Sequence, residues 1–268
     1  METQEKYIMD DEIFKQLRDM VYQWTGIYLQ DTKKYLLEGR LRNRLSENNL
    51  PDFKAYLAYL RNYANGDEKL KLIDAVTTKE TSFFREKEQF DALVSILKER
   101  AALHPSVLSV GCSTGEEPYT IGIVFKEEGL IGRIYGMDIS SSAIETAERA
   151  MYTDYSLRGT PSELIEKYFT FDGRFYHLAE DIKAMVKFYR GNVLELSDLK
   201  RAGQVDVVFC RNLFIYFDDN ARQRALENIY EVLKPKGLLF FSISEGGYLM
   251  GRLFRPRRFN RIVFYERL

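Results

Sequence analysis

The chain has 268 residues, 45% of them hydrophobic and 29% charged, and its formal net charge is −1 at pH 7. This composition is typical of a globular protein with a proper core, and the balanced charge excludes a global basic field for binding nucleic acid or anionic lipid. No apolar run approaches the roughly 18 residues that cross a bilayer, and the first residues lack an apolar signal core. We therefore expect a soluble, cytoplasmic protein.

The first part of the chain predicts helices only. Apolar residues recur at three- and four-residue steps, and Gly26 ends the first such run. Asp31 is a suitable N-cap for the second helix. The predicted helices cover about 13–24, 31–45, 53–63 and a segment that begins near 70. We assign residues 1–76 to an N-terminal all-helical domain.

The second predicted helix carries a run of basic residues outside its apolar face. They are Lys33, Lys34, Arg40, Arg42 and Arg44. A solvated charged face would explain them, and so would a docking surface for an acidic partner. The residues alone leave both interpretations open.

From about residue 105 the pattern changes to strands that alternate with helices. Apolar strand segments are predicted at 106–110, 133–138, 186–193, 205–210, 237–244 and 262–267. This alternation indicates a doubly wound, Rossmann-like α/β sheet, mainly parallel and covered on both faces. The segments RPRRFN and IVFYER are too close for a helical crossover, which predicts a hairpin and one antiparallel strand.

Residues 152–185 do not follow this alternation. They contain a predicted helix, PSELIEKYF, and then Asp172-Gly173, a hairpin-turn signal. We expect a small inserted antiparallel β subdomain at about 170–187.

Polar residues gather where the predicted parallel strands end. Gly111 and Gly115 permit a tight turn and close approach of a nucleoside, and Asp138 is placed to accept hydrogen bonds from two ribose hydroxyls. Glu116 and Glu117 open the following helix, where a pyrophosphate would meet two negative charges. A ligand with a positive group and no phosphate fits better, and S-adenosylmethionine (SAM) is such a ligand. The alternative is that both glutamates only stabilise the helix N-terminus.

Five motifs carry a family resemblance in their order along the chain. They are TTKETSFFRE, GCSTGEEPYTIGI, GMDISSSAIETAERA, NVLEL and FCRNLFIYFD. Together they resemble the chemotaxis receptor methyltransferase (CheR) family, whose members transfer a methyl group from SAM to glutamate side chains of membrane chemoreceptors. The resemblance runs through nearly the whole chain.

The resemblance implies a SAM-dependent methyltransferase domain at 91–268 and an interdomain segment at 77–90 that contributes to the cofactor site. It assigns the cofactor site to Thr81, Arg85, Glu117, Asp138, Asn192, Val193, Arg211 and Asn212. Tyr216 falls where the family has a tyrosine near the transferred methyl group, so Arg85 and Tyr216 are the expected catalytic residues. Lys79 stands where the family often has asparagine, which leaves the contact of that position open.

The same resemblance implies glutamate methyl esters as products, with S-adenosylhomocysteine (SAH) released. No general base is required, because a glutamate with a pKa of about 4.3 is already ionised at neutral pH. Arg85 would position a carboxylate belonging to the substrate, to the cofactor, or to each in turn. The basic helix Lys33–Arg44 would dock on the glutamate-rich helices of the receptor's cytoplasmic domain.

Further expectations concern partners. The segment between Phe169 and Phe175 looks shorter than in members that bind a receptor C-terminal peptide, so we expect a peptide-independent enzyme. We expect a monomer that binds no nucleic acid and does not insert into the membrane. No metal site is expected, and His104 and His177 lack partners at useful spacing.

Three other functions compete with that of a chemoreceptor methyltransferase. A nucleic-acid methyltransferase would be expected to carry an (Asp/Asn)-Pro-Pro-Tyr type motif where this chain has RNLF. A nicotinamide dehydrogenase fails on the glycine loop. A non-catalytic SAM-binding module that senses the cofactor or scaffolds a signalling complex remains the alternative, although all the proposed site residues are present.

Overall fold

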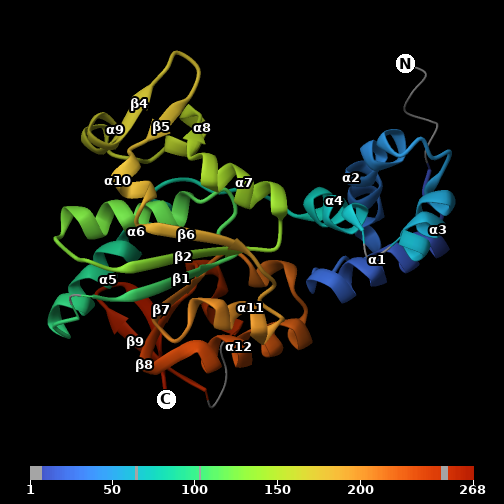
Figure 1. Cartoon of the computed structure of the whole chain (residues 1–268). Helices are drawn as coiled ribbons and strands as arrows, with labels where there is room; N and C mark the ends of the chain where they lie inside the picture. The colour runs from blue at the N-terminus through green and yellow to red at the C-terminus, as the bar shows by residue number, and fades with distance from the viewer. Residues whose placement is uncertain (1–7, 64–65, 103, 249–252) are drawn as a thin grey trace. The chain divides into compact units, whose positions relative to one another are not determined.

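The computed structural model describes residues 8–63, 66–102, 104–248 and 253–268. The chain divides into two compact units (Figure 1). The helical unit consists of Met1–Thr78 and Tyr216–Ala221, and the sheet unit consists of Lys79–Ile215 and Arg222–Leu268. Within the described ranges, no helix is both long and apolar enough to span a membrane.

The helical unit contains the four predicted helices. They are α1 (Asp11–Thr25), α2 (Lys34–Glu47), α3 (Phe53–Tyr63) and α4 (Asp67–Val76). Asp10 caps α1 by accepting a 2.7 Å hydrogen bond from Ile13 N, and Gly26 ends it in the left-handed conformation at φ 75°. The helices bury one apolar core, which includes Leu17, Val21, Leu37, Leu41, Leu45, Tyr56, Leu60 and Leu72.

A short segment from much later in the chain completes this unit. Phe217 forms an antiparallel bridge with Ile27 and is only 4% exposed. The Tyr22 hydroxyl donates to the Asp218 carboxylate at 3.0 Å. The helical unit is therefore built from two separate stretches of sequence.

The predicted start of the second helix is wrong. Asp31 opens a 3₁₀ turn, η1 (Asp31–Lys33), and α2 begins only at Lys34. The Asp31 carboxylate caps no backbone N–H and instead accepts from Arg18 at 2.5 Å. The Asp31 carboxylate is thus used in an ion pair with Arg18 instead of in an N-cap hydrogen bond.

The expectation that Arg44 belongs to an exposed basic face is also wrong. Arg44 is only 6% exposed, and its guanidinium donates to both oxygens of the buried Glu68, at 2.9 and 2.6 Å. The Tyr56 hydroxyl donates to the same carboxylate at 2.7 Å. Because a buried charge is tolerated only when it is paired and hydrogen-bonded, Arg44 is a structural residue of the α2–α4 packing.

The other basic residues of this helix lie nearer the surface. Arg42 pairs with Glu38 at 2.5 Å and Lys34 with Asp11 at 2.6 Å. Arg40 is half-buried and donates to the Val76 carbonyl and to Thr78 Oγ1. Lys33 is exposed in the turn before α2. The basic run therefore has fewer exposed cations than its sequence indicates, and acidic residues pair with two of them.

The sheet unit contains a seven-stranded sheet in the order β6-β2-β1-β7-β8-β10-β9. The strands are β1 (Ser106–Val110), β2 (Arg133–Asp138), β6 (Val186–Arg190), β7 (Val205–Cys210), β8 (Leu233–Phe240), β9 (Phe254–Phe259) and β10 (Ile262–Arg267). Strand β10 is antiparallel to both neighbours, and the other recorded pairings are parallel. The expected α/β fold, with one antiparallel strand and a terminal hairpin, is confirmed.

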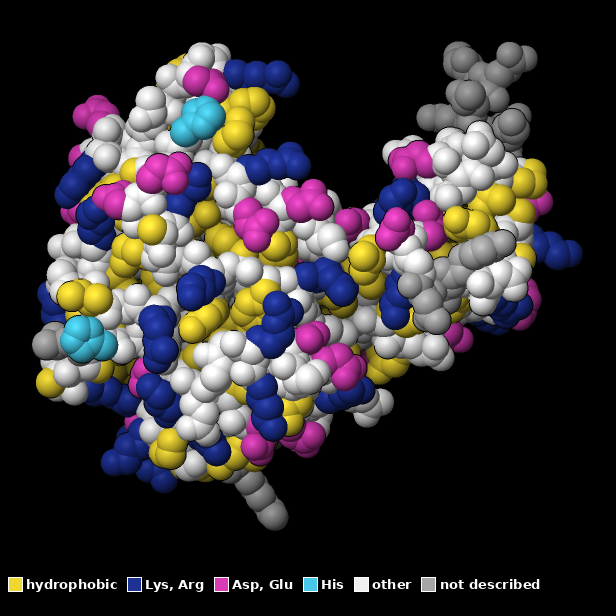
Figure 2. Space-filling view, in the orientation of Figure 1, with side chains coloured by type: hydrophobic (Ala, Val, Ile, Leu, Met, Phe, Trp, Pro, Cys, Tyr) yellow, Lys and Arg dark blue, Asp and Glu magenta, His cyan; other side chains and the backbone are white. Residues whose placement is uncertain are grey.

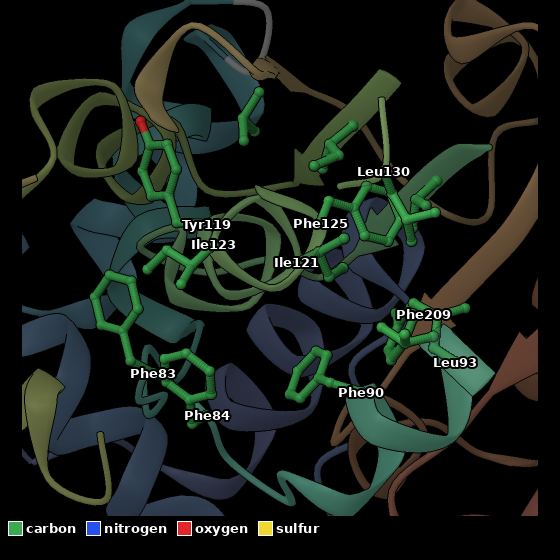
Figure 3. Close-up of a cluster of buried hydrophobic side chains, with 14 of the residues drawn as sticks. Phe83, Phe84, Phe90, Leu93, Tyr119, Ile121, Ile123, Phe125, Leu130 and Phe209 are labelled. Atoms are coloured by element: carbon green, nitrogen blue, oxygen red, sulfur yellow. The ribbon is translucent and has the colours of Figure 1, made fainter. Parts of the chain in front are cut away.

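Helices cover both faces of this sheet, with α6 and α7 on one side of the strands and α11 and α12 on the other (Figure 1). The helices are α5 (Glu88–Glu99), α6 (Glu116–Glu127), α7 (Ser141–Arg149), α8 (Asp154–Leu157), α9 (Ser162–Tyr168), α10 (Glu180–Lys183), α11 (Leu196–Leu199) and α12 (Asp219–Val232). The core between α5, α6 and the strands includes Phe90, Ile121, Phe125 and Phe209 (Figure 3).

A second, three-stranded antiparallel sheet has the order β3-β5-β4. It comprises β3 (Met151–Tyr152), β4 (Phe169–Phe171) and β5 (Tyr176–Leu178). Asp172 closes the predicted hairpin by accepting from the backbone N–H groups of Arg174 and Phe175 at 2.8 and 2.7 Å. The extent differs from the expected 170–187, because the distant β3 joins this sheet and residues from Val186 belong to the large one.

Candidate active site

The candidate site lies at one edge of the large sheet, where four neighbouring parallel strands end. In the register of β6, β2, β1 and β7, Val110 is level with Met137 and Cys210, and Asp138 is level with Arg190. The residues that follow these strands therefore come to the same edge. This is where an open α/β sheet binds ligands.

The loop after β1 wraps over the end of β2. The backbone N–H groups of Gly111 and Cys112 both donate to the Met137 carbonyl, at 2.8 and 3.1 Å. Gly115 has φ 93°, and a Cβ there would lie 2.8 Å from the Ala147 Cβ on α7. Glycine is thus required at this position both for its conformation and for the close packing of two helices.

Asp138 is held with both carboxylate oxygens in defined directions. Oδ2 accepts from Ser113 N and Oδ1 from Ser140 N, each at 2.8 Å. These two backbone hydrogen bonds fix the orientation of the carboxylate at the end of β2.

Glu117, on the first turn of α6, lies between Ser109 and Arg211. Its Oε1 accepts from Ser109 Oγ at 2.7 Å and its Oε2 from Arg211 Nη1 at 3.0 Å. Burial raises the pKa of Glu117, while the charge of Arg211 beside it acts in the opposite direction. The carboxylate is a positioned acceptor that a cationic group would stabilise in its charged form.

Glu116 differs from its neighbour, a distinction that the sequence did not reveal. It is 2% exposed and accepts from Thr114 Oγ1 at 2.7 Å. Burial raises its pKa. Glu116 therefore fastens the loop after β1 to the start of α6, and the repeated Glu-Glu in the sequence gives no sign of which carboxylate does so.

The segment 79–86 is anchored by its two buried phenylalanines, Phe83 and Phe84 (Figure 3). Phe83 N donates to the Ser156 carbonyl at 2.9 Å, and Phe84 N donates to Thr120 Oγ1 at 3.1 Å. The Phe83 ring also meets Phe169 edge-to-face, with centroids 5.1 Å apart. These contacts fix the backbone immediately before Arg85.

Arg211 joins this segment to the strand edge. Besides its bond to Glu117, it donates from Nη2 to the Arg85 carbonyl and lies 3.4 Å from the Glu86 carboxylate. Phe84 and Glu86 have φ values of 55° and 54°, a left-handed conformation that costs free energy in non-glycine residues. The surrounding contacts hold this strained turn in place.

The side chains of Thr81 and Arg85 are half-exposed. In the recorded contacts of the described chain, the Arg85 guanidinium has one hydrogen bond, to the Glu80 carbonyl at 3.3 Å. Among the residues that the structure describes, no carboxylate pairs with it. Lys79, whose contact the sequence left open, donates to Ser142 Oγ at 2.6 Å, at the start of α7.

The remaining candidate residues of the sheet unit follow β6 and β7. Asn192 N donates to Asp198 at 2.9 Å, whereas the Val193 side chain is buried and its carbonyl accepts from Asn228. Asn212 has φ 56°, and its backbone N–H donates to Glu245 at 2.6 Å. Glu245 lies outside the five sequence motifs.

Tyr216 belongs to the helical unit, so it is not part of the geometry above. It ends the 3₁₀ turn η3 (Phe214–Tyr216), and its carbonyl accepts from Tyr28 N at 2.8 Å. The sequence-predicted residues of the sheet unit are thus gathered at one strand edge and on the segment fastened to it.

The donor set fits SAM. Two acidic side chains, Glu117 and Asp138, lie at this edge, which suits a ligand carrying an ammonium and a sulfonium. Two buried polar atoms there, Ser113 Oγ and Arg211 Nε, have no hydrogen-bond partner among the described residues. Histidine makes no such cluster, since the two histidines form separate cyan patches in Figure 2.

Comparison with known proteins extends this result to nearly the whole chain. The family model of the CheR methyltransferase SAM-binding domain matches residues 79–248, and that of the CheR methyltransferase all-alpha domain matches residues 12–77. The chain is 35% identical to chemotaxis protein methyltransferase 2 of Vibrio cholerae, a match covering 96% of this chain and 93% of that protein.

Two further relatives show the same similarity. The chain is 30% identical to the chemotaxis protein methyltransferase of Escherichia coli, over 96% of this chain and 92% of the relative. It is 35% identical to a probable biofilm formation methyltransferase of Pseudomonas putida, WspC, over 92% of this chain but only 59% of that longer protein.

Proposed function

The chain belongs to the CheR methyltransferase family, and from that premise we propose that it methylates glutamate side chains of membrane chemoreceptors. It is a SAM-dependent methyltransferase of chemotaxis. The products would be glutamate methyl esters and SAH. This substrate lies in the receptors' cytoplasmic helices, so we place the enzyme in the cytoplasm.

One observation carries the proposal. The Arg85 side chain is half-exposed, extends from a backbone segment held between Phe84 and Glu86 in their left-handed conformations, and makes a single recorded hydrogen bond, to a carbonyl. A cation held in this way next to the SAM edge suits an incoming carboxylate, which it can bind by a charge-assisted hydrogen bond.

We assign the cofactor contacts as follows. Asp138 would accept the ribose hydroxyls, and Glu117, supported by Arg211, would accept the cofactor's ammonium group. Thr81, Asn192, Val193 and Asn212 would complete the pocket, Val193 through its backbone because its side chain is buried. When bound, SAM supplies an electrophilic methyl group on a positively charged sulfur.

The proposed reaction requires no general acid or general base. The substrate glutamate is already ionised at neutral pH, so no residue has to remove a proton. We assign Arg85 and Tyr216 to holding the carboxylate oxygen in line with the methyl carbon. Such positioning is worth up to roughly 7–11 kcal/mol of the barrier. Both contacts must stay weak enough to leave the carboxylate nucleophilic.

Receptor docking is proposed for the surface part of the basic run on α2 and the turn before it. Lys33 and Arg42 are its accessible cations, and Arg44 is excluded because it is buried. Charge complementarity to glutamate-rich receptor helices would speed encounter and fix orientation. The small sheet offers little for a peptide, since β4 and β5 have three residues each, and we propose that no receptor peptide is required.

The test is transfer of radiolabelled methyl from SAM to membranes that contain a chemoreceptor. Base-labile label on receptor glutamates is the expected result. Membranes whose receptor has its methylation-site glutamates replaced by alanine are the control and should stay unlabelled. SAM binding without any transfer would instead indicate a non-catalytic module and refute the proposal.

A further inference from the structure

Glu245 is a buried carboxylate outside the residues assigned so far. It lies in the 3₁₀ turn η4 (Ile243–Tyr248), after β8, and is 0% exposed. No ion pair recorded within the described ranges involves it. A buried carboxylate without a cation is costly unless hydrogen bonds replace those of water. Its partners therefore show what keeps it there.

Two of these partners are backbone N–H groups of the loop after β7, and the third is a side chain close to Glu245 in sequence. Oε2 accepts from Asn212 N at 2.6 Å, and Oε1 accepts from Ile215 N at 3.3 Å. Ser242 Oγ donates to Oε2 at 2.9 Å from within its own turn. One side chain thus holds both ends of the segment from Asn212 to Ile215.

The loop needs such support because its conformation is not relaxed. Asn212 adopts φ 56°, in the left-handed region. A hydrogen bond from a backbone N–H to a carboxylate is stronger than one to a neutral acceptor, so Glu245 stabilises this conformation directly. The preceding residue, Arg211, makes the contact with Glu117 at the strand edge.

We propose that Glu245 is a positioning residue, which presets the loop Arg211–Ile215 so that Arg211 and Asn212 meet the cofactor without rearrangement. This inference rests on the proposed cofactor contacts of those two residues. It assigns to the SISEGGY segment a role in SAM affinity, although Glu245 itself need not touch the cofactor.

The two carboxylate oxygens can be tested separately. In Glu245→Gln the single remaining oxygen is best placed at the Oε2 position, where Asn212 N and Ser242 Oγ both donate. The new amide N–H₂ then faces Ile215 N, donor against donor. Glu245→Gln should therefore keep the Asn212 anchor and release Ile215, whereas Glu245→Ala releases both.

The readouts are SAH affinity by titration calorimetry on the full chain and steady-state kinetics with receptor membranes. Glu245→Ala should weaken SAH binding about tenfold or more. Glu245→Gln should bind SAH within about threefold of the wild type. It should nevertheless lose about tenfold in kcat, because Ile215 directly precedes Tyr216 in the chain.

Glu68→Gln is the matched control, since Glu68 is a buried carboxylate of the helical unit. It should lower the melting temperature and leave SAH affinity unchanged. A folded Glu245→Ala protein that binds SAH like the wild type would overturn the proposal, as would wild-type kcat in Glu245→Gln. If the wild type labelled no receptor, the proposed substrate would be wrong, yet the SAH measurements would still decide the role of Glu245.

Discussion

Arg211 donates a 3.0 Å hydrogen bond to Glu117 and, through its other terminal nitrogen, a hydrogen bond to the Arg85 carbonyl. One guanidinium therefore links the first turn of α6 to the segment that carries the proposed catalytic arginine. A substitution at Arg211 should therefore affect both Glu117 and the position of Arg85.

Replacing Arg211 with alanine should raise the dissociation constant for SAM about tenfold or more, because the buried Glu117 loses its cation. The pKa of Glu117, already raised by burial, should rise further. The variant should then regain affinity as the pH increases, since Glu117 must be ionised to hold an ammonium group. Titration calorimetry between pH 6 and pH 9 measures this, with the exposed Arg257→Ala as the control. A pH-independent loss would argue against the role of Glu117.

Arg85→Ala should lower kcat about 10²-fold, the usual cost of removing one positioned donor. The melting temperature should change by less than about 2 °C, because the side chain is half-exposed and forms one long hydrogen bond. Arg85→Lys retains the positive charge, so its kcat should lie between those of the wild type and Arg85→Ala. Receptor methylation rates and thermal unfolding give both quantities, and full activity in Arg85→Ala would remove the catalytic assignment.

The combined reversal Lys33→Glu and Arg42→Glu should raise KM for receptor about fivefold or more at low salt while leaving SAM affinity unchanged. The effect should shrink as salt is added, because exposed charges are screened. Lys187→Glu, an exposed reversal on β6, is the control. Receptor kinetics that do not respond to the double reversal would exclude this docking surface.

The buried Arg44 and the half-buried Arg42 of α2 should differ sharply in their effect on stability. Arg44→Ala leaves Glu68 buried without its cation and should cost about 3–5 kcal/mol. Arg42→Ala breaks one ion pair, with Glu38, and should cost about 1 kcal/mol or less. Urea unfolding followed by the fluorescence of Trp24, the single tryptophan, reports on this unit. Equal losses would contradict the burial of Arg44.

Glu116 should make the stability of the wild type fall with rising pH. Burial raises its folded pKa above the ordinary 4.5, so the folded state binds more protons than the unfolded state between these two pKa values. Stability is therefore lost as the pH rises through this window. Glu116→Gln cannot titrate and keeps an acceptor for Thr114 Oγ1.

The free energy of unfolding of Glu116→Gln, minus that of the wild type, should increase with pH in urea titrations from pH 4 to pH 8. Glu99→Gln, an exposed change on α5, is the control, and its free energy of unfolding should change with pH as that of the wild type does. A Glu116→Gln difference that is flat across this range would mean that Glu116 does not titrate as burial predicts.

Much of the fold could be predicted because its elements carry strong local signals. The buried strands 106–110, 133–138 and 205–210 begin and end as expected, since continuous apolar runs bounded by glycine or polar residues leave little choice. Gly26 and Ser140 likewise end and begin their helices through local chemistry.

The errors arose where tertiary contacts decide between equivalent residues. Arg42 and Arg44 are two positions apart on one helix, and only the location of Glu68 makes the second a core residue. Glu116 is buried and accepts from Thr114, whereas Glu117 pairs with Arg211, which is distant in sequence. The β3 strand, two residues long, has no pattern of its own and exists because β5 pairs with it.

The membership of Tyr216–Ala221 in the helical unit has a consequence for biosynthesis. The bridge from Ile27 to Phe217 and the bond from Tyr22 to Asp218 cannot form when the first four helices leave the ribosome. Translation must first produce the chain as far as Asp218, which takes roughly ten to forty-five seconds at about 5–20 residues per second. Until then the apolar surface that later covers Phe217 is open to solvent and to chaperones. The N-terminal helices are therefore synthesised first, but their folded unit is among the last to be completed. A fragment that starts at Lys79 would lack the residues that cover Phe217.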